Sequence, residues 1–343
     1  MNPRVAWHLA TGSDFAWRSN EGLHLSAPQA VWVEEARGLV TIQDGGRWGA
    51  QRLGVSVGGA MDARAAMLAN VLAGNPRGAA LIELGWDAAL TLLFPQATGL
   101  ALAGAGLEAS LGEGRIPPWS PCRVEPLSLV RIRVTHGRFG YLACTGGFSL
   151  PSVFGGRGTD LRSGFGGIGG RALRSGDQLP LGDEAPGLPS HRGALAMELR
   201  PPYRRDPTLR LLPGSHWVSF PESSRAVFLG ASYAVTAVSD RMGYRLSGPP
   251  VAPDPGLEVE SEPVTGGSVQ IPLDGEPIVL MADRPTVGGY PRIGEVLAAD
   301  LPLLAQLRPG DRVRFREVGH AEAVQDLRNF EAALRRLEIA LHG

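Results

Sequence analysis

The sequence contains no lysine, so all 33 of its basic residues are arginine. This absence excludes mechanisms that need a lysine, such as Schiff-base catalysis and the phosphate contact of a Walker A loop. Arginine still holds carboxylates and phosphates through two parallel hydrogen bonds. Any anion site in this protein is therefore predicted to be built from guanidinium groups.

Cysteine, long apolar runs and net charge are also scarce. The two cysteines, Cys122 and Cys144, form no C-x-x-C motif, which is typical of a reduced cytosolic protein. No run of 18 apolar residues occurs and the amino terminus lacks a signal-peptide pattern, so we expect a cytoplasmic protein that does not contact membranes. The formal net charge of -1 gives no general attraction to nucleic acid.

Histidine is present but shows no metal-ligating pattern. None of the seven histidines pairs with another at the spacing that zinc ligands share on one helix or strand, so no zinc site is predicted. His216, between Ser215 and Trp217, is the one histidine that we single out for attention.

Glycine and proline are abundant, with 47 and 28 residues, and they interrupt short apolar runs. Runs such as Leu129–Val134 and Tyr141–Cys144 have the length of strands. We therefore predict a mostly β fold, arranged as a barrel or sandwich, with a few short helices. A chain of 343 residues exceeds the usual size of one hydrophobic core, which favours two domains.

Two helices are predicted against this background. Asp62 can cap a helix that continues to Leu72, and the sequence Gly74-Asn75-Pro76 ends it. The carboxy-terminal segment 321–343 is predicted to be an amphipathic helix. Its apolar stripe consists of Leu327, Phe330, Leu334, Leu337 and Leu341.

A short internal sequence repeat supports the division into two domains. The segments 173–179 and 307–313 both read as a Gly-Asp turn that leads into a strand. We predict an extension of unknown role over 1–30, a first domain over 31–190, a second domain over 200–320 and the terminal helix over 321–343. The boundary falls in the stretch rich in proline and glycine between Gly182 and Pro202.

Two glycine motifs resemble functional fingerprints but lack the required context. The segment 164–170, GFGGIGG, contains G-x-G-x-x-G, yet Gly176 and Pro180 stop any helix before two turns are complete. We expect these glycines to let the backbone approach a neighbouring strand or ligand. Gly54–Gly58 matches G-x-S-x-G, but polar residues precede it where a nucleophile elbow needs a buried strand.

An aspartate recurs close to an arginine in several glycine-rich loops. The pairs are Asp44 with Arg47, Asp160 with Arg157 and Arg162, Asp240 with Arg241, and Asp283 with Arg284. Such loops can hold an anionic ligand by arginine while a carboxylate serves Mg²⁺ or proton transfer. The alternative is that these residues form ion pairs that only stabilise turns.

These loops resemble those of the biotin-dependent carboxyltransferase-like family, which includes the C subunit of 5-oxoprolinase, allophanate hydrolase subunit 2 and the antagonist of a histidine-kinase inhibitor. The resemblance extends from about Val33 to Val318. The segments that carry it are 38–47, 59–62, 68–70, 74–76, 155–162, 239–246 and 281–291.

The resemblance implies two cyclophilin-like β-barrel domains, to which the predicted carboxy-terminal helix is added. It also implies the role of the C subunit in an ATP-dependent bacterial 5-oxoprolinase, which acts with a homologous B subunit to activate 5-oxoproline for hydrolysis to glutamate by an unrelated A subunit. ATP with Mg²⁺ would be shared with the partner. One alternative is carboxyl transfer to urea-like amides, with biotin on another polypeptide because this chain has no lysine. Another is a regulatory module without turnover that binds a partner similar to the kinase inhibitor.

The residues that match the family's loops form the candidate site. The predicted proton-transfer or metal-binding carboxylates are Asp44, Asp160, Asp240 and Asp283. The predicted contacts to substrate or phosphate are Arg47, Arg157, Arg162, Arg241, Arg284, Gly288, Gly289 and Tyr290.

The loops also depart from the family's usual pattern. Several positions that carry a larger or polar residue in the pattern are replaced here, at Gly45, Gly58, Gly156, Gly158 and Val287. The lost hydroxyl and amide groups would weaken a site by about 1 to 3 kcal/mol each if their partners stay buried. The framework of aspartate and arginine is retained, so a change of substrate or a loss of activity is left open.

Overall fold

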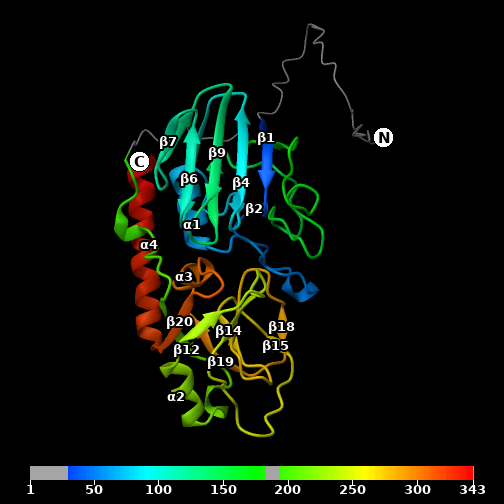
Figure 1. Ribbon diagram of the computed structural model, residues 1–343, viewed down its shortest axis with the longest axis vertical. Coiled ribbons are helices and arrows are strands. Elements are labelled where there is room, and N and C mark those ends of the chain that lie inside the picture. The colour runs from blue at the N-terminus through cyan, green and yellow to red at the C-terminus, as the bar shows by residue number, and fades with distance from the viewer. Residues whose placement is uncertain (1–29, 183–192, 343) are drawn as a thin grey trace.

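The computed structural model describes residues 30–182 and 193–342, and these form a mostly β protein, as the sequence predicts. Figure 1 shows two bodies stacked along the long axis, with the carboxy-terminal helix beside both. We call residues 30–182 the amino-terminal half and residues 208–317 the barrel half. The predicted 1–30 extension lies outside the described residues except for Ala30, and the exact domain boundaries stay predictions.

Two sheets build the amino-terminal half. The first sheet has the order β11 (Gln178–Pro180), β1 (Ala30–Arg37), β4 (Ala89–Phe94), β9 (Ser128–Val134), β6 (Leu107–Leu111) and β7 (Gly114–Ile116). The second has the order β2 (Val40–Gln43), β3 (Leu81–Leu84), β10 (Gly140–Cys144), β5 (Thr98–Gly104) and β8 (Pro121–Val124). All of their pairings are antiparallel.

The second sheet is buried on both faces, and its side chains enter two different cores. Leu100 and Leu102 of β5 pack against the first sheet, whereas the alternate residues Ala101 and Ala103 face the other way. This division follows from the period of two in a strand. The face with Ala101 belongs to the same apolar cluster as the interior of the barrel half. The two halves therefore share one continuous core.

A closed barrel of seven strands forms the second body. Its order is β12 (Thr208–Pro213), β19 (Arg292–Val296), β16 (Ser268–Gln270), β17 (Ile278–Leu280), β14 (Gly243–Ser247), β13 (Tyr233–Val235) and β20 (Arg312–Glu317). The parallel pairing of β12 with β20 contributes to its closure. A small ribbon of β15 (Glu262–Pro263) and β18 (Val287–Gly288) lies outside it.

Short helices cover the strands. These are η1 (Gln51–Leu53), α1 (Ala63–Leu72), η2 (Met197–Leu199), η3 (Trp217–Ser219), α2 (Glu222–Gly230) and α3 (Leu301–Ala305). The predicted cap of α1 is confirmed, because Asp62 accepts a hydrogen bond of 2.9 Å from the backbone of Ala65. The turn after this helix contains Gly74 at a φ of 81°.

The carboxy-terminal helix α4 (His320–His342) is confirmed and lies along both halves (Figure 1). Leu334 and Leu341 are buried, but Leu327 is exposed, so the apolar stripe begins later than predicted. Polar contacts bind the helix to both bodies. Arg77 of the amino-terminal half pairs with Glu331 and Glu338, and Arg210 of the barrel pairs with Asp326.

The internal repeat of segments 173–179 and 307–313 corresponds to two equivalent turns. Gly176 and Gly310 both have a φ of 89°, and each is followed by an aspartate that accepts a backbone hydrogen bond within its own turn. Each turn leads into a strand, β11 in one case and β20 in the other. The predicted turn-to-strand repeat is therefore confirmed in both halves.

Candidate functional site

A cleft of about 600 Å³ lies between the two halves, and we call it the inter-half cleft. It brings together five of the predicted site residues, Asp160, Arg162, Asp240, Arg241 and Asp283. Its other lining residues are Leu39, Ser56, Gly85, Trp86, Arg138, Phe139, Leu161, Ser163 and Met242. Loops that are far apart in the sequence therefore meet at this cleft.

A buried ion-pair network forms the floor of this cleft. Arg241 of the barrel half binds both oxygens of Asp283 through Nε and Nη2, at 2.7 and 2.9 Å. Its Nη1 donates to Glu83 Oε1 at 2.5 Å, and Nη2 also donates to the carbonyl of Gly59 at 2.7 Å. Arg241 is 8% exposed and Glu83 only 1%. The guanidinium therefore positions two carboxylates and has little capacity left for a substrate.

The electrostatics of this network follow from burial and close opposite charges. Burial raises the pKa of Glu83, and Arg241 partly offsets this effect. Burial alone would lower the pKa of Arg241, but Glu83 and Asp283 outweigh it and the pKa is raised. Arg241 is thus held in its charged form, and it links the two halves electrostatically.

The network continues to the start of α1. Tyr141 donates to Glu83 Oε2 at 2.8 Å and accepts from the backbone of Asp62 at 2.7 Å. The carboxylate of Asp62 then accepts from Tyr203 at 2.6 Å and from Gln306 at 2.9 Å. Burial raises the pKa of Asp62, despite these donors. This chain of contacts ties α1, β3 and β10 to the barrel half beneath the cleft.

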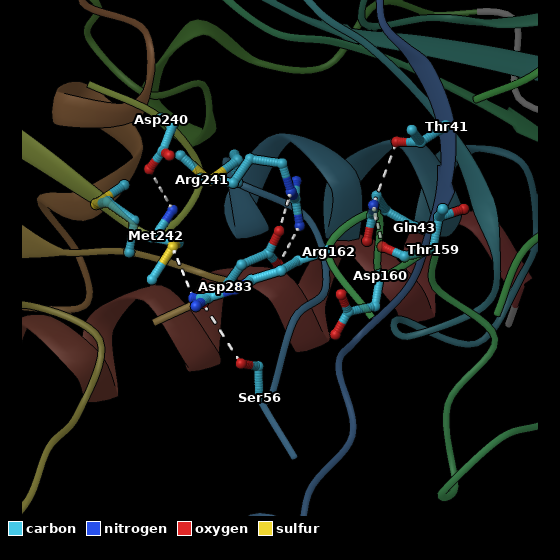
Figure 2. Close-up of polar contacts among 12 residues, drawn as sticks. Thr41, Gln43, Ser56, Thr159, Asp160, Arg162, Asp240, Arg241, Met242 and Asp283 are labelled. Carbon is cyan, nitrogen blue, oxygen red and sulfur yellow. Dashed lines mark hydrogen bonds and ion pairs between the residues drawn. The ribbon is translucent and has the colours of Figure 1, made fainter. Parts of the chain in front are cut away.

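Open polar groups line the cleft above this floor (Figure 2). Arg162 is exposed, and its only side-chain hydrogen bond among the described residues is from Nη1 to Met242 Sδ at 3.3 Å. Asp160 uses one oxygen to accept from the backbone of Ser163 at 2.9 Å. Asp240 likewise uses one oxygen for the backbone of Met242. Each of these residues keeps polar atoms available to a ligand.

Two other members of the Asp-Arg pairs have structural contacts. Asp44 accepts from the backbone N–H groups of Gly46, Arg157 and Gly158, at 2.8, 2.5 and 3.1 Å. Arg157 is exposed and donates from Nε to the carbonyl of Leu150. Neither Asp44 nor Arg157 lines the inter-half cleft. Both residues therefore stabilise loops, but through backbone hydrogen bonds and not through the ion pairs that the alternative supposed.

Arg47 lies fully buried beneath the glycine-rich loop. Its Nη2 donates to the carbonyl of Gly158, and its guanidinium lies 4.7 Å from the ring centre of Phe165. Its Nε and Nη1 have no hydrogen-bond partner among the described residues. Gly58, Gly156 and Gly158, three of the positions that depart from the family pattern, all approach this arginine or the neighbouring Asp44 and Gln43.

The segment GFGGIGG forms turns over this arginine, so the rejection of the dinucleotide motif is confirmed. Gly164–Arg171 contains turns and isolated bridges with no helix. Gly164, Gly166, Gly167, Gly169 and Gly170 all have positive φ. A Cβ at Gly166 would overlap the carbonyl of Gly158, so this backbone does approach a neighbouring segment closely.

A comparison of two alanine variants tests this close approach. Gly164 and Gly166 have φ values of 70° and 72°, but a Cβ at Gly164 would meet nothing within 4 Å. We expect Gly164→Ala to lower the free energy of unfolding by about 1 kcal/mol, and Gly166→Ala by about 3 kcal/mol or more, because backbone atoms must shift. Urea unfolding measures both values. Equal losses would show that only the dihedral angle matters.

The other predicted contacts lie elsewhere. Gly288 lies in β18, and Gly289 and Tyr290 follow it; none of the three lines the inter-half cleft or the cleft that Arg284 lines. Val287 belongs to the same ribbon and is exposed. Asp44 and Arg284 line a separate cleft, together with Gly45 and Gly58. The predicted set is therefore divided among at least three places.

The acidic centre of the network was not predicted from the sequence. Glu83 is the one charged residue of the strand Leu81–Leu84, whose residues are all buried. A carboxylate in a fully buried strand is rare unless it is paired, so this position was a usable signal. Arg138 and Trp86 carried no comparable pattern. Ser56 of the rejected G-x-S-x-G motif donates to the carbonyl of Arg284 at 3.0 Å.

Within residues 30–182 and 193–342, no group of three or more His, Cys, Asp or Glu side chains is arranged to hold a metal ion. No helix in this part of the chain combines the length and hydropathy needed to cross a bilayer. His216 lies in a surface cluster with Ser215, Glu262 and Arg292, away from the inter-half cleft.

Comparisons with known proteins agree on one family. Residues 53–317 match the family described as "Carboxyltransferase domain, subdomain A and B". The chain is 36% identical over 303 residues to the 5-oxoprolinase C subunit of Haemophilus influenzae, covering 88% of this chain and 96% of that protein. It is 35% identical over 306 residues to the 5-oxoprolinase C subunit of Escherichia coli, covering 88% and 96%. The urea carboxylase structure from Kluyveromyces lactis superposes with a TM-score of 0.82 at 27% identity, over 92% of this chain and 30% of that longer chain.

Proposed function

The chain belongs to the carboxyltransferase domain family, and from this premise we propose that it is the C subunit of an ATP-dependent bacterial 5-oxoprolinase. It would act with a homologous B subunit to activate 5-oxoproline for hydrolysis to glutamate by an A subunit. The observation that carries the proposal is the similarity to two proteins named as the C subunit of 5-oxoprolinase, which covers 96% of each of them.

The chemistry of the inter-half cleft supports this proposal. The oxygen of a lactam is a weak nucleophile, so activation needs groups that bind developing phosphate charge and hold both reactants in place. Arg162 supplies a guanidinium with available donors, and Asp160, which lines the same cleft, supplies a free carboxylate oxygen. In the proposed site, Arg162 contacts the anion, and Asp160 and Asp240 are the candidates for the proton acceptor and for the metal ligand. Arg241 and Glu83 are positioning residues.

In the proposed complex, ATP and its metal ion would bind in this cleft, which a partner subunit would complete. Mg²⁺ in nucleotide sites is held by one or two carboxylates together with phosphate oxygens. Asp160 and Asp240 line the cleft, and each has one oxygen without a hydrogen-bond partner among the described residues. When bound, Mg²⁺ would offset the charge of the phosphates. A complex that uses ATP would work in the cytoplasm.

Carboxyl transfer to urea-like amides is the second candidate function. The TM-score of 0.82 to urea carboxylase favours it, but that likeness covers only 30% of the longer chain. This chain has no lysine, so biotin would have to be carried by another polypeptide. A regulatory module without turnover, binding a partner similar to a kinase inhibitor, is the third candidate.

Reconstitution with the partner subunits tests the proposal. The chain is co-expressed with B-type and A-type subunits from the same genome, and ATP-dependent glutamate release from 5-oxoproline is measured with each subunit omitted in turn. We expect release only from the full set. Urea with a carboxylated biotin carrier serves as the competing substrate. A stable, fully assembled complex that releases no glutamate would contradict the proposal, and carboxyl transfer to urea would favour the second candidate.

A further inference from the structure

A second cleft of about 430 Å³ lies on the other side of the loops that line the inter-half cleft. It is bounded by α1 on one side and by the loops around Thr265 and Met281 on the other. The start of α3 closes one end, and Figure 1 shows this helix between the sheets and the barrel. Arg284 and Asp44 are predicted site residues that line this space, but the contacts proposed in the inter-half cleft do not use it.

Two neighbouring loops form the wall between the clefts. The backbone of Gly58 donates to the carbonyl of Ala282 at 3.0 Å, which joins a loop of the amino-terminal half to one of the barrel half. The next two residues of the barrel loop then point in opposite directions. Asp283 lines the inter-half cleft, whereas Arg284 lines the second cleft.

Arg284 is a buried guanidinium without a counter-ion. It is 9% exposed, and its Nη1 donates to the carbonyl of Met281 at 3.2 Å. Nε and Nη2 have no hydrogen-bond partner among the described residues, and no carboxylate lies within 4.0 Å of the group there. Burial lowers the pKa of Arg284. The edge formed by Nε and Nη2 presents two parallel N–H donors that can bind both oxygens of a carboxylate side by side.

The other charged groups at this cleft are already satisfied. Both oxygens of Asp44 accept backbone N–H groups, so they stabilise their own loop. Arg77 is paired with Glu331 and Glu338 of α4. Glu295, which interacts electrostatically with Arg284, accepts from Thr265 and Ser268 and pairs with Arg292. Among the described residues that line this cleft, the Nε and Nη2 edge of Arg284 is therefore the one cationic group available to a ligand.

The walls of the second cleft are mostly apolar. α1 contributes Ala63, Ala66 and Met67, and the opposite side contributes Met281, Leu301 and Pro302. Small-molecule sites typically combine such walls with a few polar groups that fix orientation. A single guanidinium matches the charge of a monoanion, whereas phosphate is usually bound by several donors.

We propose that the second cleft binds a small organic monocarboxylate, with its carboxylate on Nε and Nη2 of Arg284 and its compact apolar body against α1. The carboxylate of such a ligand would lie on the opposite side of the loop wall from the inter-half cleft that Asp283 lines. Its apolar body would lie between the two halves. This inference rests on the contacts of Arg284 and the shape of the cleft, and it stands whether or not the chain acts on 5-oxoproline.

Calorimetric titration of the full chain with isobutyrate tests the proposal. Isobutyrate has a branched body of suitable size, and isobutyramide is its neutral counterpart of the same shape. We expect isobutyrate to bind with a Kd of about 1 to 10 mM, as suits so small a ligand. Isobutyramide and inorganic phosphate should each bind at least about tenfold more weakly, because they lack either the charge or the apolar contact.

Two variants locate the binding. Arg284→Gln should weaken isobutyrate binding at least about tenfold. Ala63→Leu places a larger side chain on the exposed start of α1 and should have a similar effect while leaving Arg284 intact, so it remains informative if Arg284→Gln is unstable. Arg162→Gln, in the other cleft, should leave the affinity unchanged. Equal binding of acid and amide, tighter binding of phosphate, or unchanged affinity in Ala63→Leu would overturn the proposal.

Discussion

Replacement of Arg241 by alanine is expected to lower the free energy of unfolding by about 3 to 5 kcal/mol, because it leaves Glu83 buried without its counter-charge. The variant also removes the donors that hold Asp283 and the carbonyl of Gly59. The contacts to Glu83 and Gly59 cross between the two halves. Urea unfolding at pH 7, followed by tryptophan fluorescence and circular dichroism, measures the loss.

Arg162→Ala is the matched control for this stability measurement. Arg162 lines the same cleft but is exposed, so its removal should change the free energy of unfolding by less than about 0.5 kcal/mol. The double variant with Glu83→Ala should lose less than the sum of the single losses, since neither partner is then left as an unpaired charge. An Arg241→Ala variant as stable as the control would show that the network does not hold the halves together.

Arg162→Ala should affect turnover and not stability, in contrast to the large stability loss of Arg241→Ala. In the reconstituted complex we expect nearly unchanged stability and a turnover about 100-fold lower. Three arginines line the inter-half cleft. Arg241 is bound by two carboxylates, and Arg138 donates to the carbonyls of Ser239 and Leu307. Arg162 is the one with most of its donors available, and a single well-placed donor contributes about 100-fold to 1000-fold in rate. Steady-state glutamate release measures the effect.

An arginine far from the cleft controls for general charge effects. Arg131 is exposed on the outer face of the first sheet, and Arg131→Ala removes the same charge. It should retain the turnover of the unmodified complex. Similar losses in both variants would assign the effect to net charge or assembly, and unchanged turnover in Arg162→Ala would remove this residue from the proposed chemistry.

The features that the sequence predicted well were local. The cap at Asp62, the terminal helix and the paired Gly-Asp turns depend on residues within a few positions of one another, and the structure contains all of them. The dinucleotide interpretation of GFGGIGG was also decided locally, because the required helix could not fit before Gly176. Local patterns therefore carried both the positive and the negative conclusions.

Which charges face a ligand could not be predicted in this way. Asp44 and Asp283 look equivalent in sequence, each close to an arginine in a glycine-rich loop. In the structure, Asp44 accepts three backbone N–H groups, whereas Asp283 pairs with an arginine 42 residues away. Glu83 and Arg241 are 158 residues apart and belong to different halves. These pairings depend on how the two bodies pack, and a short sequence pattern cannot predict that packing.

Chemical blockage of the inter-half cleft tests the central claim most directly. Ser163 is exposed in this cleft, and only its backbone bonds to Asp160, so Ser163→Cys keeps that contact. The variant also carries Cys122→Ser, because the partly exposed Cys122 could react with the maleimide. Cys144 is buried and is left unchanged. A bulky maleimide is attached in the assembled complex, and ATP-dependent glutamate release is measured. We predict that labelling abolishes release and that 5-oxoproline with ATP slows labelling. A fully labelled complex that turns over at the unlabelled rate would contradict the assignment of this cleft.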